Sequence, residues 1–391
     1  LFALDIAIAR SRLQEARAIA RLADADLGPT VGLGANAYRL DTNLQNPISA
    51  DTRALLAQNP LAGSIRDNRL QKHANILGLG LSASWEPDIF GQKQSDADAA
   101  RHAALATAEQ THAAQLLISA EIADQYHRAR ATEARKRAAD TTITTLEQLA
   151  RYIEARYQAG HTTAYEKDEI QSRLSAAKAK RSTLDAEKNA AVRAIAILCG
   201  DTPQHYRLPD SPRDTLAHPP AAPRGQTPQG LIERRPDLRA RAAQIDAYAA
   251  KLASAKADLY PRLTLNFLGN GVLNIDSDNT QKSLISLLGA SLQVPLYTNG
   301  RIQANIDAAD ARLKTALLQY DQTLLQALAD VDNAYQASDA LATQTRLLAQ
   351  ARDEAEKQAT DAEKLYRYGN KTLADALSAR LSANQAAENQ L

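Results

Sequence analysis

The chain repeats itself, and this internal repeat constrains its fold more than any other feature. Residues 91–100 (GQKQSDADAA) align without a gap with residues 300–309 (GRIQANIDAA), at an offset of 209 positions. Upstream, residues 25–29 (ADLGP) match residues 257–261 (ADLYP) at an offset of 232. The offsets, 232 and 209, differ by 23, so the first copy carries 23 additional residues between the two matched segments. A tandem duplication predicts two equivalent structural units rather than several unrelated domains.

The repeat divides the chain into a first structural repeat at 1–200, a Pro-rich linker at 201–230 and a second structural repeat at 231–391. In the first repeat we expect a helix at 1–28, strands at 30–40 and 76–86, and long helices at 92–140 and 144–199. In the second we expect a helix at 236–259, strands at 262–272 and 286–297, and long helices at 300–345 and 348–391. Pro29 and Pro261 end the opening helices, because proline cannot continue a helical hydrogen-bond ladder.

The four predicted strands alternate apolar residues with Gly, Ser, Asn and Gln, and each has about ten residues, enough to cross a bilayer when tilted. Four strands cannot close a barrel, and an open edge in lipid leaves backbone groups unpaired, so we expect three copies to form twelve strands. Aromatic residues in or beside these strands fit a girdle at the membrane interface. The girdle candidates are Tyr38, Trp85, Phe90, Tyr260, Phe267 and Tyr297.

Composition excludes several classes of protein. The chain has 46 Lys and Arg against 45 Asp and Glu, so its net charge gives no reason to expect binding to nucleic acid. Its single cysteine cannot form an internal disulfide. No run approaches the roughly 18 to 20 apolar residues of a membrane-spanning helix. After Gly300, small and apolar residues recur with a 3.5-residue period that indicates left-handed supercoiling. We therefore expect long, closely packed helices.

Four motifs resemble one known family, and together they cover the length of the chain. The motifs are residues 84–92 (SWEPDIFGQ), 231–239 (LIERRPDLR), 255–265 (AKADLYPRLTL) and 294–301 (VPLYTNGR). They are similar to the outer-membrane efflux proteins of TolC type, and the first motif resembles the lipoprotein subgroup that serves resistance-nodulation-division drug pumps.

The resemblance implies an α+β membrane protein in the bacterial outer membrane. Its trimeric twelve-stranded β-barrel, with four strands per chain, is continuous with a twelve-helix periplasmic α-barrel. It also implies a passive exit duct for antibiotic and drug efflux. The implied partners are two further copies of the chain, a periplasmic adaptor, an inner-membrane drug transporter and outer-membrane lipid. No cofactor or metal is implied, and a lipidated cysteine would precede Leu1.

The resemblance also implies a periplasmic gate where paired helices turn, at a Tyr-x-x-Gly pattern that occurs twice, beginning at Tyr157 and Tyr366. Acidic and polar residues six and nine positions after each Gly would form rings at the narrowest point. The implied gate residues are Asp375, Ser378, Glu166, Glu169, Tyr366, Lys371 and Tyr157.

The sequence also contains a pattern found in di-iron carboxylate proteins. Glu109 and His112 form a Glu-x-x-His pair, but a di-iron site needs a second such pair, and the repeat offers Asp321 at the position equivalent to His112. We find no nucleophile and base set, so we do not expect an enzyme. A duct for type I protein secretion remains an alternative, and a soluble trimeric coiled-coil structural protein is a weaker one.

Overall fold

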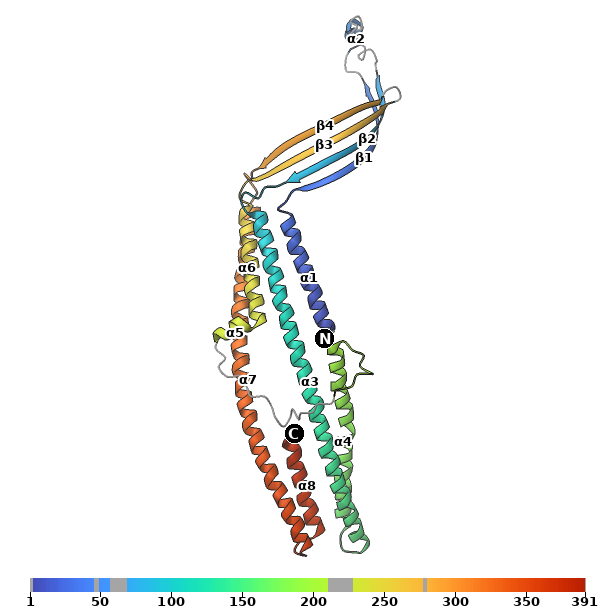
Figure 1. Cartoon of the computed structure of the whole chain (residues 1–391), viewed down its shortest axis with the longest axis vertical. Coiled ribbons are helices and arrows are strands. Elements are labelled where there is room, and N and C mark those ends of the chain that lie inside the picture. Colours follow the sequence, from blue (N-terminus) through green and yellow to red (C-terminus); the bar gives the residue numbers. More distant parts are fainter. Residues whose placement is uncertain (1–2, 46–48, 57–68, 210–227, 277–279, 391) are drawn as a thin grey trace. The chain divides into compact units, whose positions relative to one another are not determined.

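The structure is a computed structural model that describes residues 3–45, 49–56, 69–209, 228–276 and 280–390 (Figure 1). The chain divides into two compact units. One unit comprises 1–15, 105–243 and 317–391, and the other comprises 16–104 and 244–316. The first consists of helices, whereas the second holds the sheet and the helix segments that adjoin it.

The helices repeat with the offsets found in the sequence. Helices α1 (Leu4–Ala25) and α6 (Pro236–Ala257) each have 22 residues and begin 232 positions apart. Helices α3 (Gln92–Gln158) and α7 (Arg301–Arg367) each have 67 residues and begin 209 positions apart. Both members of each pair thus begin and end at equivalent residues.

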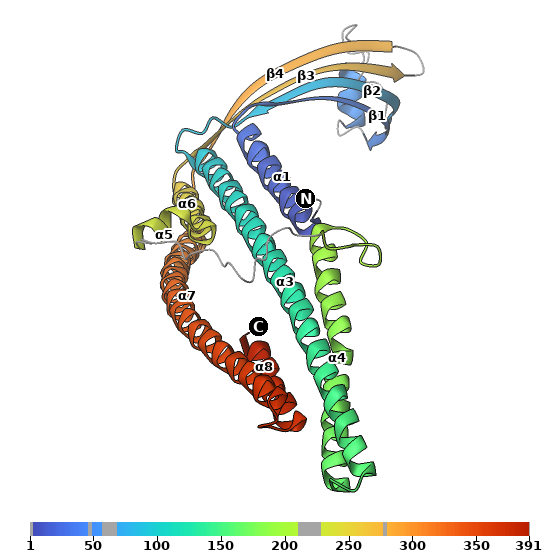
Figure 2. The same ribbon diagram turned by 60° about the horizontal axis from the view of Figure 1, so that its bottom comes forward.

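The remaining helices are α4 (Ala164–Cys199), α8 (Leu373–Gln390) and the short α2 (Ala50–Leu56) and α5 (Pro228–Arg234). In both views α4 lies beside α3, and α8 lies beside α7 (Figure 2). Among the described residues, none of the helices combines the length and apolarity needed to cross a bilayer.

The expected inner boundaries of the long helices are wrong. We expected breaks between 140 and 144 and between 345 and 348, but α3 and α7 continue through both. Residues 141–145 (TTITT) are all β-branched, but β-branched residues lower helix propensity only slightly. There the Thr141 hydroxyl donates to the Arg137 carbonyl at 3.1 Å, and Thr144 donates to Asp140 at 2.9 Å. The helix therefore absorbs these side chains, and no Gly or Pro stops it.

The sheet is an antiparallel meander in the order β1 (Thr30–Gln45), β2 (Arg69–Trp85), β3 (Arg262–Asp276) and β4 (Thr280–Gln293). These strands have 14 to 17 residues, so the expected ranges 30–40, 76–86, 262–272 and 286–297 were too short at the loop ends. The last strand ends at Gln293 rather than at 297, just before Pro295, which has no amide hydrogen for a ladder.

The two faces of the sheet differ in chemistry, as the alternation predicts. On one face Thr30, Ser84 and Asn266 lie in one row, and the Ser84 hydroxyl and the Asn266 side-chain oxygen are 3.0 Å apart. Gly78 faces Asn36 across the ladder, and a Cβ at Gly78 would lie 2.1 Å from the Asn36 side-chain oxygen. Glycine at this position leaves room for a polar side chain on the sheet surface.

Small buried residues hold the helices together within each unit. In the sheet-bearing unit, Ala255 packs against Ile302, Ile306 and Ala309, which joins α6 to α7. In the helical unit, one cluster joins α1 to α3 through Ile6 and Ile118. Alanine side chains allow two helices to approach closely. Each buries little apolar area, so polar contacts between the helices supply much of the rest of the stabilisation.

Candidate functional site

Each pair of long helices in the helical unit is joined by a turn of the same construction. Gly160 follows α3 with a φ of 75°, and its amide donates to the Tyr157 carbonyl at 3.0 Å. The His161 amide donates to the Arg156 carbonyl at 2.8 Å. This pair of hydrogen bonds is a Schellman motif. Gly369, with a φ of 78°, ends α7 in the same way. The Tyr-x-x-Gly pattern therefore marks both turns.

Thr163 and Thr372 cap the next helix, and each lies three residues before the acid that follows a turn glycine by six residues. The Asp375 amide donates to the Thr372 hydroxyl at 3.2 Å, and the Thr372 amide donates to the Asp375 carboxylate at 3.0 Å. This reciprocal arrangement is a capping box. In the first copy, Thr163 accepts from the Glu166 amide at 3.4 Å. Sequence reasoning missed these caps, although a Thr followed three residues later by an acid could have indicated them.

The cap also fixes the charge of Asp375. Hydrogen bonds from the hydroxyl and amide of Thr372, with a smaller contribution from the positive charge of Lys371, lower the pKa of the Asp375 carboxyl. Asp375 therefore remains ionised well below neutral pH. The carboxylate also lies at the N-terminus of α8, where the helix dipole favours negative charge.

The other expected gate residues lie at the same two turns. Glu169 accepts a hydrogen bond from Arg173 at 2.5 Å, one turn further along α4. The Lys167 ammonium lies 5.0 Å from the centre of the Tyr157 ring. Tyr366 is 42% exposed, and Lys371 and Ser378 are exposed. The structure thus gathers Tyr157, Glu166 and Glu169 at the first turn and Tyr366, Lys371, Asp375 and Ser378 at the second.

A row of acids on α3 pairs with bases on α4. The acids recur every seven residues and thus lie on one face of a supercoiled helix. The pairs are Glu133 with Lys188 at 3.2 Å, Asp140 with Arg181 at 2.9 Å, Glu147 with Lys178 at 2.8 Å and Glu154 with Lys167 at 3.0 Å. Sequence reasoning did not identify this ladder, although the seven-residue spacing of the acids is visible in the chain.

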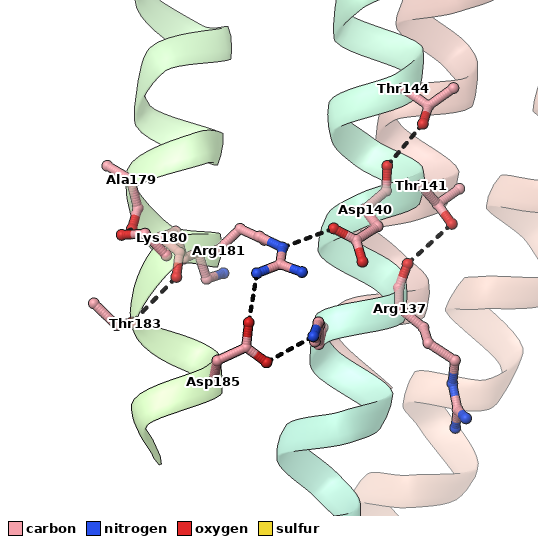
Figure 3. A network of polar contacts seen from close by, with 11 residues as sticks. Arg137, Asp140, Thr141, Thr144, Ala179, Lys180, Arg181, Thr183 and Asp185 are labelled. Carbon is pink, nitrogen blue, oxygen red and sulfur yellow. Dashed lines mark hydrogen bonds and ion pairs between the residues drawn. The ribbon is translucent and has the colours of Figure 1, made fainter. Parts of the chain in front are cut away.

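Figure 3 shows the most connected step of the ladder. The Arg181 guanidinium reaches from α4 to the Asp140 carboxylate on α3 and also donates to Asp185 at 2.8 Å. Asp185 in turn accepts from the Lys136 ammonium at 2.6 Å. These hydrogen bonds, from Lys136 first and Arg181 second, lower the pKa of Asp185. One arginine and one aspartate thus connect both helices.

The second helix pair keeps only the part of this ladder nearest the turn. Glu356 and Glu363 on α7 are equivalent to Glu147 and Glu154 at the 209 offset, and both pair with Arg380 of α8. The positions equivalent to Glu133 and Asp140 are alanines 342 and 349. The duplicated acids have therefore kept their roles but acquired different cationic partners.

Helix α8 also packs against the first helix pair. Leu377 lies in a cluster with Leu149 and Ile153 of α3. The Asn384 side-chain amide donates to the Thr145 hydroxyl of α3 at 3.2 Å. Because both turns belong to one unit and α8 contacts α3, a change at one helix pair is physically linked to the other.

The aromatic candidates in the sheet-bearing unit fall into two groups. Phe90 stacks on Tyr260 with ring centres 5.0 Å apart, and the Trp85 indole donates to the Leu27 carbonyl at 3.0 Å. The Tyr297 hydroxyl lies 3.3 Å from the Asn299 side-chain oxygen. Trp85 is the last residue of β2, Phe90 and Tyr297 follow β2 and β4, and Tyr260 precedes β3, so these four aromatics lie at the end where strands connect to helices.

The other two aromatic candidates lie within strands. Phe267 lies on the apolar face of β3, whereas the preceding Asn266 lies on the polar face. Tyr38 lies on the polar face of β1, where its hydroxyl accepts a hydrogen bond from the Asn36 amide. This position does not suit a lipid-facing girdle, because polar side chains of a membrane strand face the lumen.

Comparison with known proteins settles the family. A model of outer membrane efflux proteins matches residues 3–201 and 227–391. The chain belongs to the outer membrane efflux protein family. It is 27% identical over 371 residues to the pyoverdine export outer membrane protein OpmQ of Pseudomonas aeruginosa, covering 94% of this chain and 74% of OpmQ. It is 25% identical over 395 residues to the cation efflux system protein CusC of Escherichia coli, covering 97% and 77%.

The solved structure of the outer-membrane channel OprN superposes with a TM-score of 0.83 at 26% identity, covering 99% of this chain and 83% of OprN. The expected fold class is thereby confirmed: the chain supplies four strands and long helices to a trimeric outer-membrane channel. This efflux protein resides in the outer membrane, with its helical part in the periplasm, and serves as the outer-membrane channel of a tripartite pump. Its family is one of channels, not enzymes.

Proposed function

We propose that this efflux protein is the passive exit duct of a multidrug pump, working with a periplasmic adaptor and an inner-membrane drug transporter. The observation that carries the proposal is the family match over both repeats, together with the first motif around Trp85, which resembles the drug-pump subgroup. OpmQ is named for pyoverdine and CusC for cations. Since one fold serves such different cargo, we infer that the partner pump selects the substrate and the duct conducts it.

Expression in a strain that lacks its own outer-membrane channels tests this function. Together with a resistance-nodulation-division drug pump and its periplasmic adaptor, the chain should raise resistance to several unrelated organic drugs. Rescue of metal tolerance alone would overturn the multidrug assignment. Secretion of a protein substrate would favour the type I secretion alternative, and failure to restore any export would contradict the duct itself.

We further propose that the two turns form a gate that is closed by rings of carboxylates from three copies. Asp375, Glu166 and Glu169 are exposed or half-exposed, and the cap keeps Asp375 ionised. Like charges close together in a narrow passage repel one another and attract cations. The ring residues would thus make the closed tip cation-selective, while Tyr157, Tyr366, Lys371 and Ser378 surround them at the turns.

The capping role requires a matched pair of variants, because Asp375→Ala removes both the charge and the cap. Asp375→Asn retains a carbonyl oxygen for the Thr372 amide but removes the charge, and it should reduce cation selectivity and cation block of the closed channel. Thr372→Val removes the hydroxyl of the cap but leaves the carboxylate, and it should leave selectivity unchanged. Single-channel recording in bilayers measures both. Equal behaviour of the two variants would show that Asp375 acts as a cap and not as a charged ring.

A further inference from the structure

The apolar face of the sheet has a shallow hollow at Gly271. In one cross-strand row Gly271 lies between Leu79 of β2 and Leu284 of β4, and its missing side chain leaves the row open. Among the described residues, a Cβ at Gly271 would have only the Leu79 carbonyl oxygen within 4 Å, at 3.6 Å. The space over Gly269 is filled instead, because the Phe267 ring lies 3.4 Å from that Cβ position.

The hollow extends from Gly271 toward the loop that joins β3 to β4. Its volume is about 340 Å³, at the small end of the roughly 300–1,000 Å³ of ligand clefts. Among the residues that line it, Leu77, Leu79 and Leu273 share the apolar face with Gly271. Lys282 of β4 pairs with Leu273 across the ladder and also lines the hollow, at its loop end. The hollow is therefore apolar with a single cation at one end.

The charge of Lys282 is not neutralised by the part of the chain that the structure describes. Its side chain is exposed, and it forms no ion pair with a described residue. On the apolar face the described strands carry one carboxylate, that of Asp41, which pairs with Arg39 at 3.5 Å. A charged side chain is costly in hydrocarbon unless it reaches the interface or an anion. Lys282 therefore requires a partner from outside the chain.

The place of Lys282 along the sheet puts it near the outer lipid headgroups. Its row includes Leu77, which lies eight residues from Trp85 at the end of β2 that leads to the helices. At about 3.3 Å per residue and a tilt of about 40°, eight residues give roughly 20 Å of height. The apolar band of such barrels is about 25 Å tall, and a lysine stem can extend to its edge. Because the helical part is periplasmic, this edge belongs to the outer leaflet.

We propose that the hollow binds lipid A, the phosphorylated multi-chain lipid of the outer leaflet. One acyl chain lies over Gly271 against the three leucines that line the hollow, and a phosphate lies at the Lys282 ammonium. A phosphate monoester attracts this ammonium, whereas a zwitterionic phospholipid carries its own cation beside its phosphate. The hollow is formed by β2, β3 and β4 of one chain, so each trimer has three of them.

Native mass spectrometry of the detergent-solubilised trimer with added lipid A tests the charge. The native chain should bind lipid A in preference to phosphatidylethanolamine. Lys282→Gln should weaken lipid A binding roughly fivefold, the loss expected for one lysine facing an anionic lipid. Lys314→Gln is the control, because it makes the same change of charge on α7, where Lys314 pairs with Asp310.

Two results of this measurement would overturn the proposal. One is equal binding of lipid A to Lys282→Gln and Lys314→Gln. The other is undiminished binding of lipid A from which both phosphates have been removed, which should bind the native trimer as weakly as phosphatidylethanolamine does.

Gly271→Val tests the hollow, because valine suits a strand and its side chain would occupy the space of the acyl chain. It should lower the number of lipid A molecules retained per trimer. Gly34→Val is the matched control, since a Cβ at Gly34 also meets no atom within 4 Å but projects from the polar face. Assembled Gly271→Val trimers that bind lipid A like the native chain would overturn the placement of the acyl chain. Should Gly271→Val not assemble, Lys282→Gln decides alone, because it alters an exposed side chain and no packing.

Discussion

Arg380 donates two hydrogen bonds to one oxygen of Glu363, at 3.0 and 2.6 Å, and so connects α8 to α7 seventeen residues earlier in the chain. The same guanidinium pairs with Glu356. The Arg380 side chain is 25% exposed, so water screens this contact less than it screens most ion pairs of the chain. Arg380 thus connects α8 to two acids of α7.

Arg380→Gln should loosen α8 from α7, because two carboxylates lose their shared partner. Charge pairs that are partly exposed contribute about 1 kcal/mol, which corresponds to about a fivefold faster amide exchange in α8 if exchange proceeds through local opening. Hydrogen exchange with mass spectrometry measures it. Lys314→Gln is the control, since Lys314 pairs with Asp310 on its own helix. Equal effects of the two variants would contradict the prediction.

Acid should weaken the α3 to α4 pair. Hydrogen bonds from Lys178, Lys167 and Lys136 hold the pKa values of Glu147, Glu154 and Asp185 below their ordinary values of 4.5 for Glu and 3.8 for Asp. A lowered folded-state pKa gives stability that is present above the unfolded pKa and is lost as pH falls through the folded one.

The thermal midpoint of the helices, followed by circular dichroism, should therefore stay level from pH 8 to 6 and fall below about pH 4.5. Asp185→Asn should reduce the size of that fall, because it removes one of the titrating groups. Asp310→Asn, which affects a pair within α7, serves as its control. A midpoint in the native chain that does not change down to pH 3 would refute the role of the ladder.

Gly160→Ala and Gly369→Ala should each destabilise the local turn by about 1 kcal/mol, because an L residue with a side chain resists the left-handed conformation. Nothing lies within 4 Å of the Cβ position at either glycine, so the cost arises from the backbone alone. Gly34→Ala is the control, because a Cβ at Gly34 also meets no atom within 4 Å but the φ of Gly34 is not positive. Limited proteolysis at the turns compares the three variants. A larger effect at Gly34 would be inconsistent with this reasoning.

Gly78→Ala should weaken the barrel, because the new methyl group would meet the Asn36 side chain. Asn36→Ser in the same chain shortens that side chain and should restore most of the lost stability. The temperature at which the trimer dissociates on a gel reports the effect. If the double variant is no more stable than Gly78→Ala alone, the two residues are not in contact.

Much of this fold follows from the repeat and from the period of apolar residues. The offsets locate equivalent helices and strands, and the Tyr-x-x-Gly pattern locates both turns, because Gly permits the left-handed conformation that ends a helix. The expected breaks at 141–143 and 346–347 were wrong, because both helices continue through them; at the first, threonine hydroxyls bond within the helix.

The candidate site was less predictable than the fold. The resemblance implied gate roles for Asp375 and Glu166. It did not reveal that both lie in the first turn of a helix, at the caps before Ala164 and Leu373, which the Thr three residues before each acid could have indicated. Likewise, the seven-residue spacing of Glu133, Asp140, Glu147 and Glu154 identifies a face, but not which cation on α4 reaches each acid. Side-chain reach in three dimensions decides those partners.

The equal length of α3 and α7 restricts how such a chain can vary. Each residue added to an α-helix advances it by about 1.5 Å and turns everything beyond it by about 100°. A single inserted residue in α3 would rotate its acids away from the face that meets α4. It would also make α3 longer than α7, so the two turns would no longer end helices of equal length. Relatives that differ in helix length should therefore differ by whole heptads, and by the same number in both copies.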